Sequence, residues 1–278
     1  MIRIHHLNNS RSQRILWLLE ELRQPYKVVP YQRDATTRLA PPELKRVHPL
    51  GKSPVIVDDG RVVAETGAII EYLVLKYDDG KLAPAVDPDS ADYRAYLHWM
   101  HFVEGSAMLP LMLKLYVGRL GDAGKPLWPR IDSELKNHFD YMEGALGAND
   151  YIVANRFSAA DIHLSFILDA GAARGPLSGY PRLTALHSLL KARPAYKRAI
   201  ERGGPYKLGR RSFTTAAAAL WSPSRTRACG RPARAGRARR RATCRGAAPR
   251  PGWRSAWSTC RPTGTRRRRP RSRAPCRW

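Results

Sequence analysis

The spacing of apolar residues divides the chain into two halves of different secondary structure. The first half contains four apolar runs of strand length, at residues 1–7, 26–31, 55–57 and 61–63. Three helical stretches separate or follow them, at residues 12–23, 43–47 and 68–77. From residue 89 onward the apolar positions recur at helical spacing, and no convincing strand follows. The pattern predicts an α/β sandwich of thioredoxin type, followed by an all-α domain.

The helical half is predicted to begin after a linker at residues 78–88, which is rich in Asp, Gly and Pro. Its helices are expected at about residues 91–116, with a bend at Pro110, and at residues 127–146, 159–170, 182–192 and 195–202. Residues 118–126 are predicted to form a loop. Ser158 and Asp161 have the spacing of a capping box, with Asp in place of the usual Glu. We therefore expect domains at residues 1–80 and 88–206, and a separate tail at residues 209–278.

Charge also divides the chain, at about residue 208. Residues 1–208 hold all 23 acidic residues and 28 of the 49 basic ones, which gives a net charge of +5. This part has no apolar run approaching the ~20 residues of a membrane span, and its start lacks a signal-peptide core. We therefore predict a cytoplasmic protein that does not contact membranes.

Residues 209–278 contain 21 arginines, all four cysteines and no acidic residue. Such unbalanced charge with little apolar periodicity predicts disorder. One explanation is an arm that binds nucleic acid, or an anionic membrane surface, because phosphate attraction needs only positive charge. The other, which we favour, is a frameshift product, because every Asp, Glu, Lys and His disappears at once. The cysteines lack a C-x-x-C pair, so a zinc site has little support.

Residues 50–72 carry the most specific combination of features. Asp58-Asp59-Gly60 joins two β-branched runs and predicts a hairpin. If the Ser53–Pro54 bond before it is cis, the backbone of Ser53 is free to pair with an extended peptide. Glu65 and Thr66 precede or begin a helix whose free N–H groups attract a carboxylate. A strand edge beside a helix N-terminus suits a small acidic peptide.

These features resemble the cytosolic glutathione transferases. Ser53-Pro54 looks like the cis-proline site of that family, and Glu65-Thr66 looks like its pair that holds the γ-glutamyl end of glutathione. Lys52 stands where theta-like members place a lysine near the glycine carboxylate. Residues 7–22, LNNSRSQRILWLLEEL, are similar to the first helix of bacterial and fungal members. The resemblance covers residues 1–208.

The resemblance implies that glutathione is the co-substrate and that its thiolate attacks an electrophile. In serine-type members a hydroxyl after the first strand stabilises the thiolate, and Ser10 matches that position when Arg14 is aligned on the family's helix-1 arginine. Asn9 is the alternative donor. The electrophile is expected beside the first loop and the long helix, near Phe102, Met108 and Tyr116.

We therefore predict a homodimeric glutathione transferase that conjugates glutathione to small hydrophobic electrophiles. Peroxidase, isomerase and dehalogenase activities stay open, but the lack of cysteine before residue 229 disfavours cysteine-type members. We predict no metal, because His98 and His101 have no Cys or carboxylate to complete a site. The alternatives are a non-catalytic scaffold that binds glutathione, and a nucleic-acid-binding protein that acts through its tail.

Overall fold

The computed structural model describes residues 1–174 and 176–208, so the predictions for residues 209–278 lie outside the described residues. The first half contains one sheet with the strand order β2-β1-β3-β4. These strands are β1 (Ile2–Leu7), β2 (Tyr26–Tyr31), β3 (Val55–Asp58) and β4 (Arg61–Ala64). Strand β1 pairs in parallel with β2 and antiparallel with β3, and β3 pairs antiparallel with β4. This mixed sheet confirms the predicted thioredoxin-type half.

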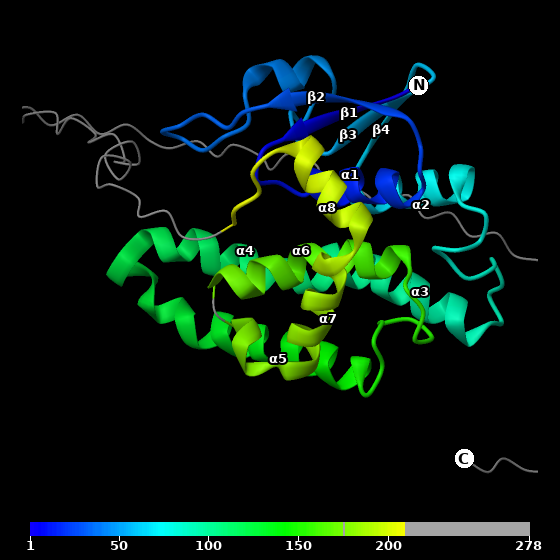
Figure 1. Ribbon diagram of the computed structural model, residues 1–278. Coiled ribbons are helices and arrows are strands. Elements are labelled where there is room, and N and C mark those ends of the chain that lie inside the picture. The colour runs from blue at the N-terminus through cyan, green and yellow to red at the C-terminus, as the bar shows by residue number, and fades with distance from the viewer. Residues whose placement is uncertain (175, 209–278) are drawn as a thin grey trace, which may run out of the picture. The chain divides into compact units, whose positions relative to one another are not determined.

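Two helices pack on one side of this sheet, between it and the helices that follow (Figure 1). They are α1 (Ser12–Glu21) and α2 (Thr66–Tyr77), and a 3-10 helix, η1 (Pro42–Arg46), occupies the predicted second helical stretch. Every residue of α1 from Ser12 to Leu19 is buried. The nearly continuous apolar sequence of α1 is explained by this position, because the helix has neighbours on all sides.

The β3–β4 hairpin is held in two ways. Asp59 and Gly60 both have positive φ, 47° and 79°, and Asp58 pairs with Arg61, which is the geometry of a type I′ turn. The buried carboxylate of Asp58 also accepts hydrogen bonds from three side chains of α2, those of Tyr72, Lys76 and Tyr77, at 2.6 to 2.8 Å. The hairpin and α2 are therefore tied together, which fixes the Glu65–Thr66 junction between them.

The second half is helical. Its helices are α3 (Ala91–Phe102), α4 (Met108–Val117), α5 (Trp128–Leu146), α6 (Ala159–Arg174), α7 (Pro181–Ala192) and α8 (Pro194–Gly203). A short 3-10 helix, η4 (Pro176–Gly179), joins α6 to α7. Helix α6 is buried without interruption from Ala159 to Gly171, so it forms the centre of the helical domain. A Cβ atom at Gly171 would lie 2.8 Å from the ring of Phe139, which explains the glycine.

Two predictions for this half are wrong in detail. The predicted helix over residues 91–116 departs from α geometry at η2 (Val103–Ala107), a π-helical turn ahead of Pro110 rather than at it. Residues 118–126, predicted as a loop, belong to 3-10 turns, η3 (Gly118–Leu127), which Gly121 interrupts with φ 56° and ψ −129°. Glycine and proline oppose a long α-helix there, but they permit short 3-10 turns.

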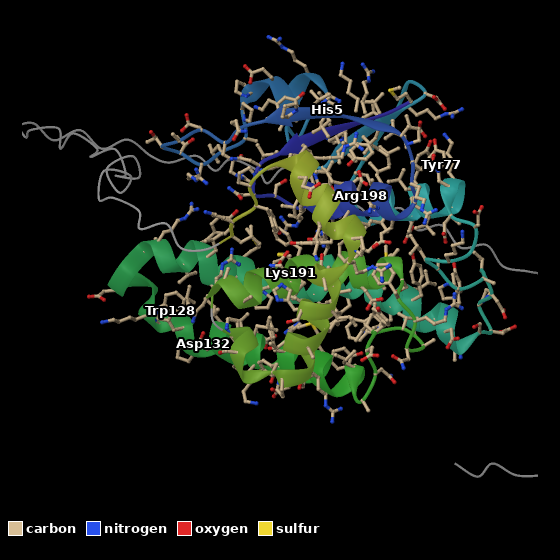
Figure 2. All side chains as sticks on the ribbon, viewed as in Figure 1. His5, Tyr77, Trp128, Asp132, Lys191 and Arg198 are labelled. Atoms are coloured by element: carbon tan, nitrogen blue, oxygen red, sulfur yellow. The ribbon has the colours of Figure 1, made fainter. Side chains whose placement is uncertain are left out.

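Helix α8 returns the chain to the first domain (Figure 1). It packs along α1, where Arg198 bonds the carboxylate of Glu20 at 2.8 Å (Figure 2). Arg193, at its start, makes a two-pronged contact with Glu21 at 2.7 and 3.0 Å. The last helix and the first helix are thus held together by ion pairs as well as by apolar packing.

Half of the predicted capping box is present: the Asp161 side chain bonds back to Ser158, whereas the N–H of Asp161 bonds to the carbonyl of Ser158, at 3.1 Å, and not to its hydroxyl. The Asp161 carboxylate accepts from the N–H and the hydroxyl of Ser158, at 2.9 and 3.0 Å, and from the N–H of Ile152 at 3.0 Å. Within residues 1–174 and 176–208, no helix is both long enough and apolar enough to cross a membrane.

Candidate functional site

The structure gathers the predicted glutathione residues around a cavity of about 270 Å³. All five line it: Lys52, Ser53, Pro54, Glu65 and Thr66. They come from the segment before β3 and from the β4–α2 junction, which the antiparallel hairpin brings side by side. The sequence motif is therefore also a spatial cluster.

Ser53 forms one edge of this cavity. The Ser53–Pro54 bond is cis, as the resemblance implies. The hydroxyl of Ser53 donates to the carbonyl of His5 at 2.8 Å and accepts from the N–H of Leu7 at 3.2 Å. Its own N–H and C=O make no backbone hydrogen bond within the part of the chain that is described. This edge can accept an extended peptide backbone.

The N-terminus of α2 forms the opposite side. Glu65, its N-cap residue, adopts φ 71° and ψ 129°, a conformation that residues with a side chain rarely adopt, and its carboxylate does not cap the helix. Thr66 follows and is nearly buried. The uncapped N–H groups of the first turn remain available to an anion. Strain of this kind is typical of ligand-binding positions.

The helical domain contributes one acidic side chain, Glu104, from the π-helical turn. Both its oxygens lie 3.0 Å from Nε of Arg11, and Arg14 donates to it at 2.5 Å. Burial acts to raise the pKa of Glu104, but the charges and hydrogen bonds of Arg14 and Arg11 outweigh burial and lower the pKa. Glu104 is therefore ionised and links the first helix to the helical domain.

Three polar lining residues were not predicted: Arg11, His48 and Glu104. Arg11 directly follows Ser10, and His48 lies just before residues 50–72, so proximity in sequence offers a weak signal for both. Glu104 lies in the middle of a predicted helix, and the π-helical turn sets its direction. No pattern in the sequence indicates that turn.

The two predicted thiol-activating residues lie beside this cavity without lining it. Ser10 is 4% exposed, and its Oγ accepts from the N–H of Ser12 at 3.2 Å and lies 2.8 Å from Oγ of that residue. Asn9 has φ 51°, and its side-chain oxygen accepts from the N–H of Lys207 at 2.6 Å. The first loop is thus in contact with the segment after α8.

The predicted electrophile residues are not gathered at one place. Met108 is 3% exposed and belongs to the core, whereas Tyr116 is 54% exposed. The ring of Phe102 packs against His98 and Tyr141, with centroids 5.6 and 5.3 Å away, which directs it toward α5. None of them lines the 270 Å³ cavity.

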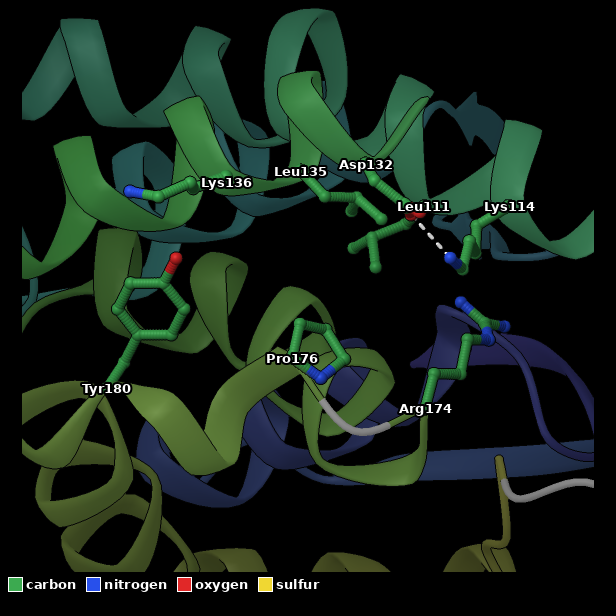
Figure 3. Close-up of a pocket in the computed structure, with 8 residues that line it drawn as sticks. All are labelled: Leu111, Lys114, Asp132, Leu135, Lys136, Arg174, Pro176 and Tyr180. Atoms are coloured by element: carbon green, nitrogen blue, oxygen red, sulfur yellow. Dashed lines mark hydrogen bonds and ion pairs between the residues drawn. The ribbon is translucent and has the colours of Figure 1, made fainter. Parts of the chain in front are cut away.

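A second cavity, of about 290 Å³, lies between α4, α5 and the η4 region (Figure 3). Leu111, Leu135 and Pro176 form apolar walls, and Lys114 pairs with Asp132 at its mouth. Arg174 also lines it and forms no ion pair with a carboxylate of the described residues. Among the residues that the structure describes, no group of three or more His, Cys, Asp or Glu is placed to hold a metal.

A thioredoxin-like domain with an open strand edge, followed by a helical domain that contributes to the same cavity, defines a two-domain protein whose first half has the thioredoxin fold. Family models refine this class. Residues 2–74 match "Glutathione S-transferase, N-terminal domain" and residues 102–194 match "Glutathione S-transferase, C-terminal domain". The chain belongs to the glutathione S-transferase family.

Individual relatives agree. Glutathione S-transferase 1 of Saccharomyces cerevisiae is 38% identical, over 60% of this chain and 80% of the relative. Glutathione S-transferase 3 of Schizosaccharomyces pombe is 36% identical, over 73% of this chain and 88% of the relative. Among solved structures, a glutathione S-transferase from Actinobacillus pleuropneumoniae has 33% identity and a TM-score of 0.67, covering 73% of this chain and 93% of that one. A sphingomonad glutathione S-transferase solved with glutathione has 25% identity and a TM-score of 0.60, covering 73% of this chain and 98% of that one.

Proposed function

We propose that this protein conjugates the thiolate of glutathione to small hydrophobic electrophiles. One observation carries the proposal: a free strand edge at Ser53 and an uncapped helix N-terminus at Thr66 face the same cavity. The names of the relatives support transferase activity over the non-catalytic scaffold.

Each end of glutathione has a suitable partner in this arrangement. The backbone of Ser53 would pair with the cysteinyl unit, as in an added strand. The N-terminus of α2 and Thr66 would hold the γ-glutamyl carboxylate, and the carboxylate of Glu65 its amine. Lys52, together with His48 beside it, would attract the glycine carboxylate.

Ser10 is the proposed donor to the thiolate, and Asn9 is the alternative. Ser10 lies just ahead of α1, where the helix dipole also favours negative charge. Neither residue is the base that keeps the thiol proton, because its hydrogen bond acts by stabilising S⁻.

A homodimer and a cytoplasmic location also stay proposals. The dimer is supported by exposed apolar side chains on β4, α2 and α4: Val62, Leu75, Leu109 and Leu113. Light scattering coupled to gel filtration tests the dimer, because it measures the mass of the particle directly.

The test of activity is turnover of glutathione and a chromogenic aryl halide by the full chain. Ser10→Ala is expected to lower kcat/KM at least tenfold, equivalent to about 1.4 kcal/mol of transition-state stabilisation. Ser188→Ala, which removes a hydroxyl bonded only to the carbonyl of Thr184 on α7, is the matched control.

Turnover that survives Ser10→Ala unchanged would keep the transferase and shift the donor role to Asn9. Binding of glutathione without turnover of any electrophile would favour the scaffold instead. A protein that does not bind glutathione would refute the proposal altogether.

A further inference from the structure

A continuous chain of buried hydrogen bonds runs from the first loop to the end of α8. Oγ of Ser10 lies 2.8 Å from Oγ of Ser12, which lies 2.8 Å from Nδ1 of His6. Nε2 of His6 lies 3.1 Å from the carbonyl oxygen of Gly203. The three side chains are at most 4% exposed. These hydrogen bonds therefore connect the first loop with Gly203, which lies 197 positions after His6 in the sequence.

The direction of every hydrogen in this chain follows from its last member. A carbonyl oxygen only accepts, so Nε2 of His6 carries a hydrogen. The pKa of His6 is lowered, chiefly by burial, so the ring is neutral at physiological pH and Nδ1 is an acceptor. Ser12 must then donate to Nδ1, which leaves the hydroxyl of Ser10 to donate to Ser12. Ser12 also lies 3.3 Å from the carbonyl of Leu7, a longer contact than the one to His6.

The close approach of α8 is built into the sequence. A Cβ atom at Gly203 would lie 2.6 Å from Cδ1 of Leu16, 2.9 Å from Oε1 of Gln13 and 3.4 Å from Nε2 of His6. Because Leu16 is fully buried, its side chain cannot yield easily. Glycine therefore allows the last turn of α8 to reach His6, and the carbonyl it presents stands at the negative end of the helix dipole.

We propose that Ser10, Ser12 and His6 form a proton relay, which we call the first-loop relay, through which His6 receives the thiol proton of bound glutathione. This inference rests on the proposed function. The thiol proton passes to Oγ of Ser10 as the Ser10 proton passes to Oγ of Ser12 and the Ser12 proton passes to Nδ1 of His6. One S–H bond breaks, one N–H bond forms, and no proton leaves the protein.

After proton transfer, the first-loop relay provides the hydrogen bond to the thiolate that transferase chemistry needs. After transfer, His6 donates to Ser12, Ser12 donates to Ser10, and Ser10 donates to the thiolate. The starting directions of the hydrogens all point toward His6, so no side chain has to leave its position. Ser12 is a positioning residue in this scheme, because it touches Ser10 and not the substrate.

Two influences act on the charge of His6. Burial lowers its pKa, and the hydrogen bond to the Gly203 carbonyl raises it. No ionised side chain of the described residues contributes to the shift. A thiolate at the other end of the relay adds the missing negative charge, so the imidazolium is favoured only when glutathione is bound.

The decisive experiment observes His6 in the full-length wild-type protein by 15N NMR with labelled histidine. The chain has eight histidines, and the signal that disappears in His6→Asn is assigned to His6. On addition of glutathione, His6 is expected to change from a neutral ring to an imidazolium. S-methylglutathione, which has no thiol proton, is the control ligand and is expected to leave His6 neutral.

Ser12→Ala interrupts the relay at its centre while leaving its backbone N–H to hold Ser10. We expect the ultraviolet thiolate absorbance of bound glutathione at neutral pH to disappear, and kcat/KM to fall about tenfold. His5→Asn is the matched control: His5 precedes His6, and its Nδ1 lies 2.9 Å from the hydroxyl of Tyr31, outside the relay. His5→Asn is expected to retain both signals.

The outcomes separate the two proposals. If glutathione binds and is turned over, but His6 stays neutral while the thiolate forms, the relay is refuted and the transferase stands. If S-methylglutathione also produces the imidazolium, the proton does not come from the thiol, and the relay is again refuted. If glutathione does not bind at all, the proposed function fails, and the relay fails with it.

Discussion

The two sides of the proposed glutathione site are held in place over very different lengths of chain. The peptide-binding side extends only from Lys52 to Thr66, and one hairpin joins its ends. The thiol side, at Ser10, is held by two contacts with distant residues. Gly203 accepts a hydrogen bond from His6, and Lys207 donates one to Asn9. In the proposed function, affinity for glutathione comes from a local motif, whereas activation of its thiol would depend on packing between the first and last helices.

The largest loss of stability is expected at Arg14, which links the first helix to the helical domain. Arg14 is 2% exposed and bonds Glu104 and the carbonyl of His163. Arg14→Met removes one partner of a largely buried ion pair and is expected to lower the free energy of unfolding by about 3 kcal/mol in urea titrations. Arg11→Met, which removes a more exposed partner of the same carboxylate, is expected to cost less than ~1 kcal/mol. Equal losses in the two variants would contradict the comparison.

Asp161, which belongs to neither side of the proposed glutathione site, is expected to make the free energy of unfolding depend on pH. Burial raises the pKa of Asp161 to about 6, against the hydrogen bonds from Ser158 and Ile152, which lower it. Because this pKa exceeds the unfolded value of ~3.9, the folded state binds the extra proton, and stability falls as pH rises through this range. Relative to Asp161→Asn, the wild type is expected to lose about 2 kcal/mol between about pH 4 and pH 7. A pH-independent difference in urea titrations would overturn the assignment.

On the peptide-binding side, Thr66→Val is expected to weaken glutathione binding about tenfold in calorimetry, because it removes one hydrogen bond to a charged group. Its fold should be unchanged, since the hairpin and α2 are held by Asp58 instead. Thr36→Val, in an exposed turn, is the matched control. An unchanged affinity in the first variant would remove Thr66 from the site.

The smallest effect is expected at the outer contact of the thiol side. Asn9→Ala removes the bond to Lys207 and places alanine at φ 51°, so amide exchange at Lys207 should accelerate about fivefold, or ~1 kcal/mol. Asn9→Gly removes the same bond but tolerates positive φ. If exchange responds to Ala and not to Gly, backbone conformation rather than the hydrogen bond holds the loop.

The sequence predicts the peptide-binding side well because its information is local. The Asp-Asp-Gly turn, Pro54 and the Glu65–Thr66 junction lie within thirteen residues of one another and specify their own geometry. The fold class follows from periodicity in the same way. Glu104 and His6 are different. The arginine partners of Glu104 and the Gly203 partner of His6 come from distant parts of the chain, and neither residue lies in a sequence pattern that is associated with chemistry.

The predicted electrophile residues fail to gather for a related reason. The predicted positions of Phe102 and Tyr116 depend on a helix over residues 91–116 whose only departure from regular geometry is a bend at Pro110. The π-helical turn changes the direction of the side chains on one side of it relative to the other, so faces assigned from a 3.6-residue period no longer coincide. Such a turn has no reliable sequence signal.

The contact of α8 with β1 also has a consequence for the order of events during synthesis. The thioredoxin-like half leaves the ribosome first, and domains generally fold as they emerge. Nε2 of His6 and the side-chain oxygen of Asn9, however, have no partner until Gly203 and Lys207 have been made. A nascent chain of about 150 residues would therefore hold the peptide-binding motif complete, with its first loop anchored through Asn8 to Tyr31 and Arg33 but not yet to α8 or the segment after it. Translation of α8 and of the four residues after Gly203, as far as Lys207, completes the contacts of the loop.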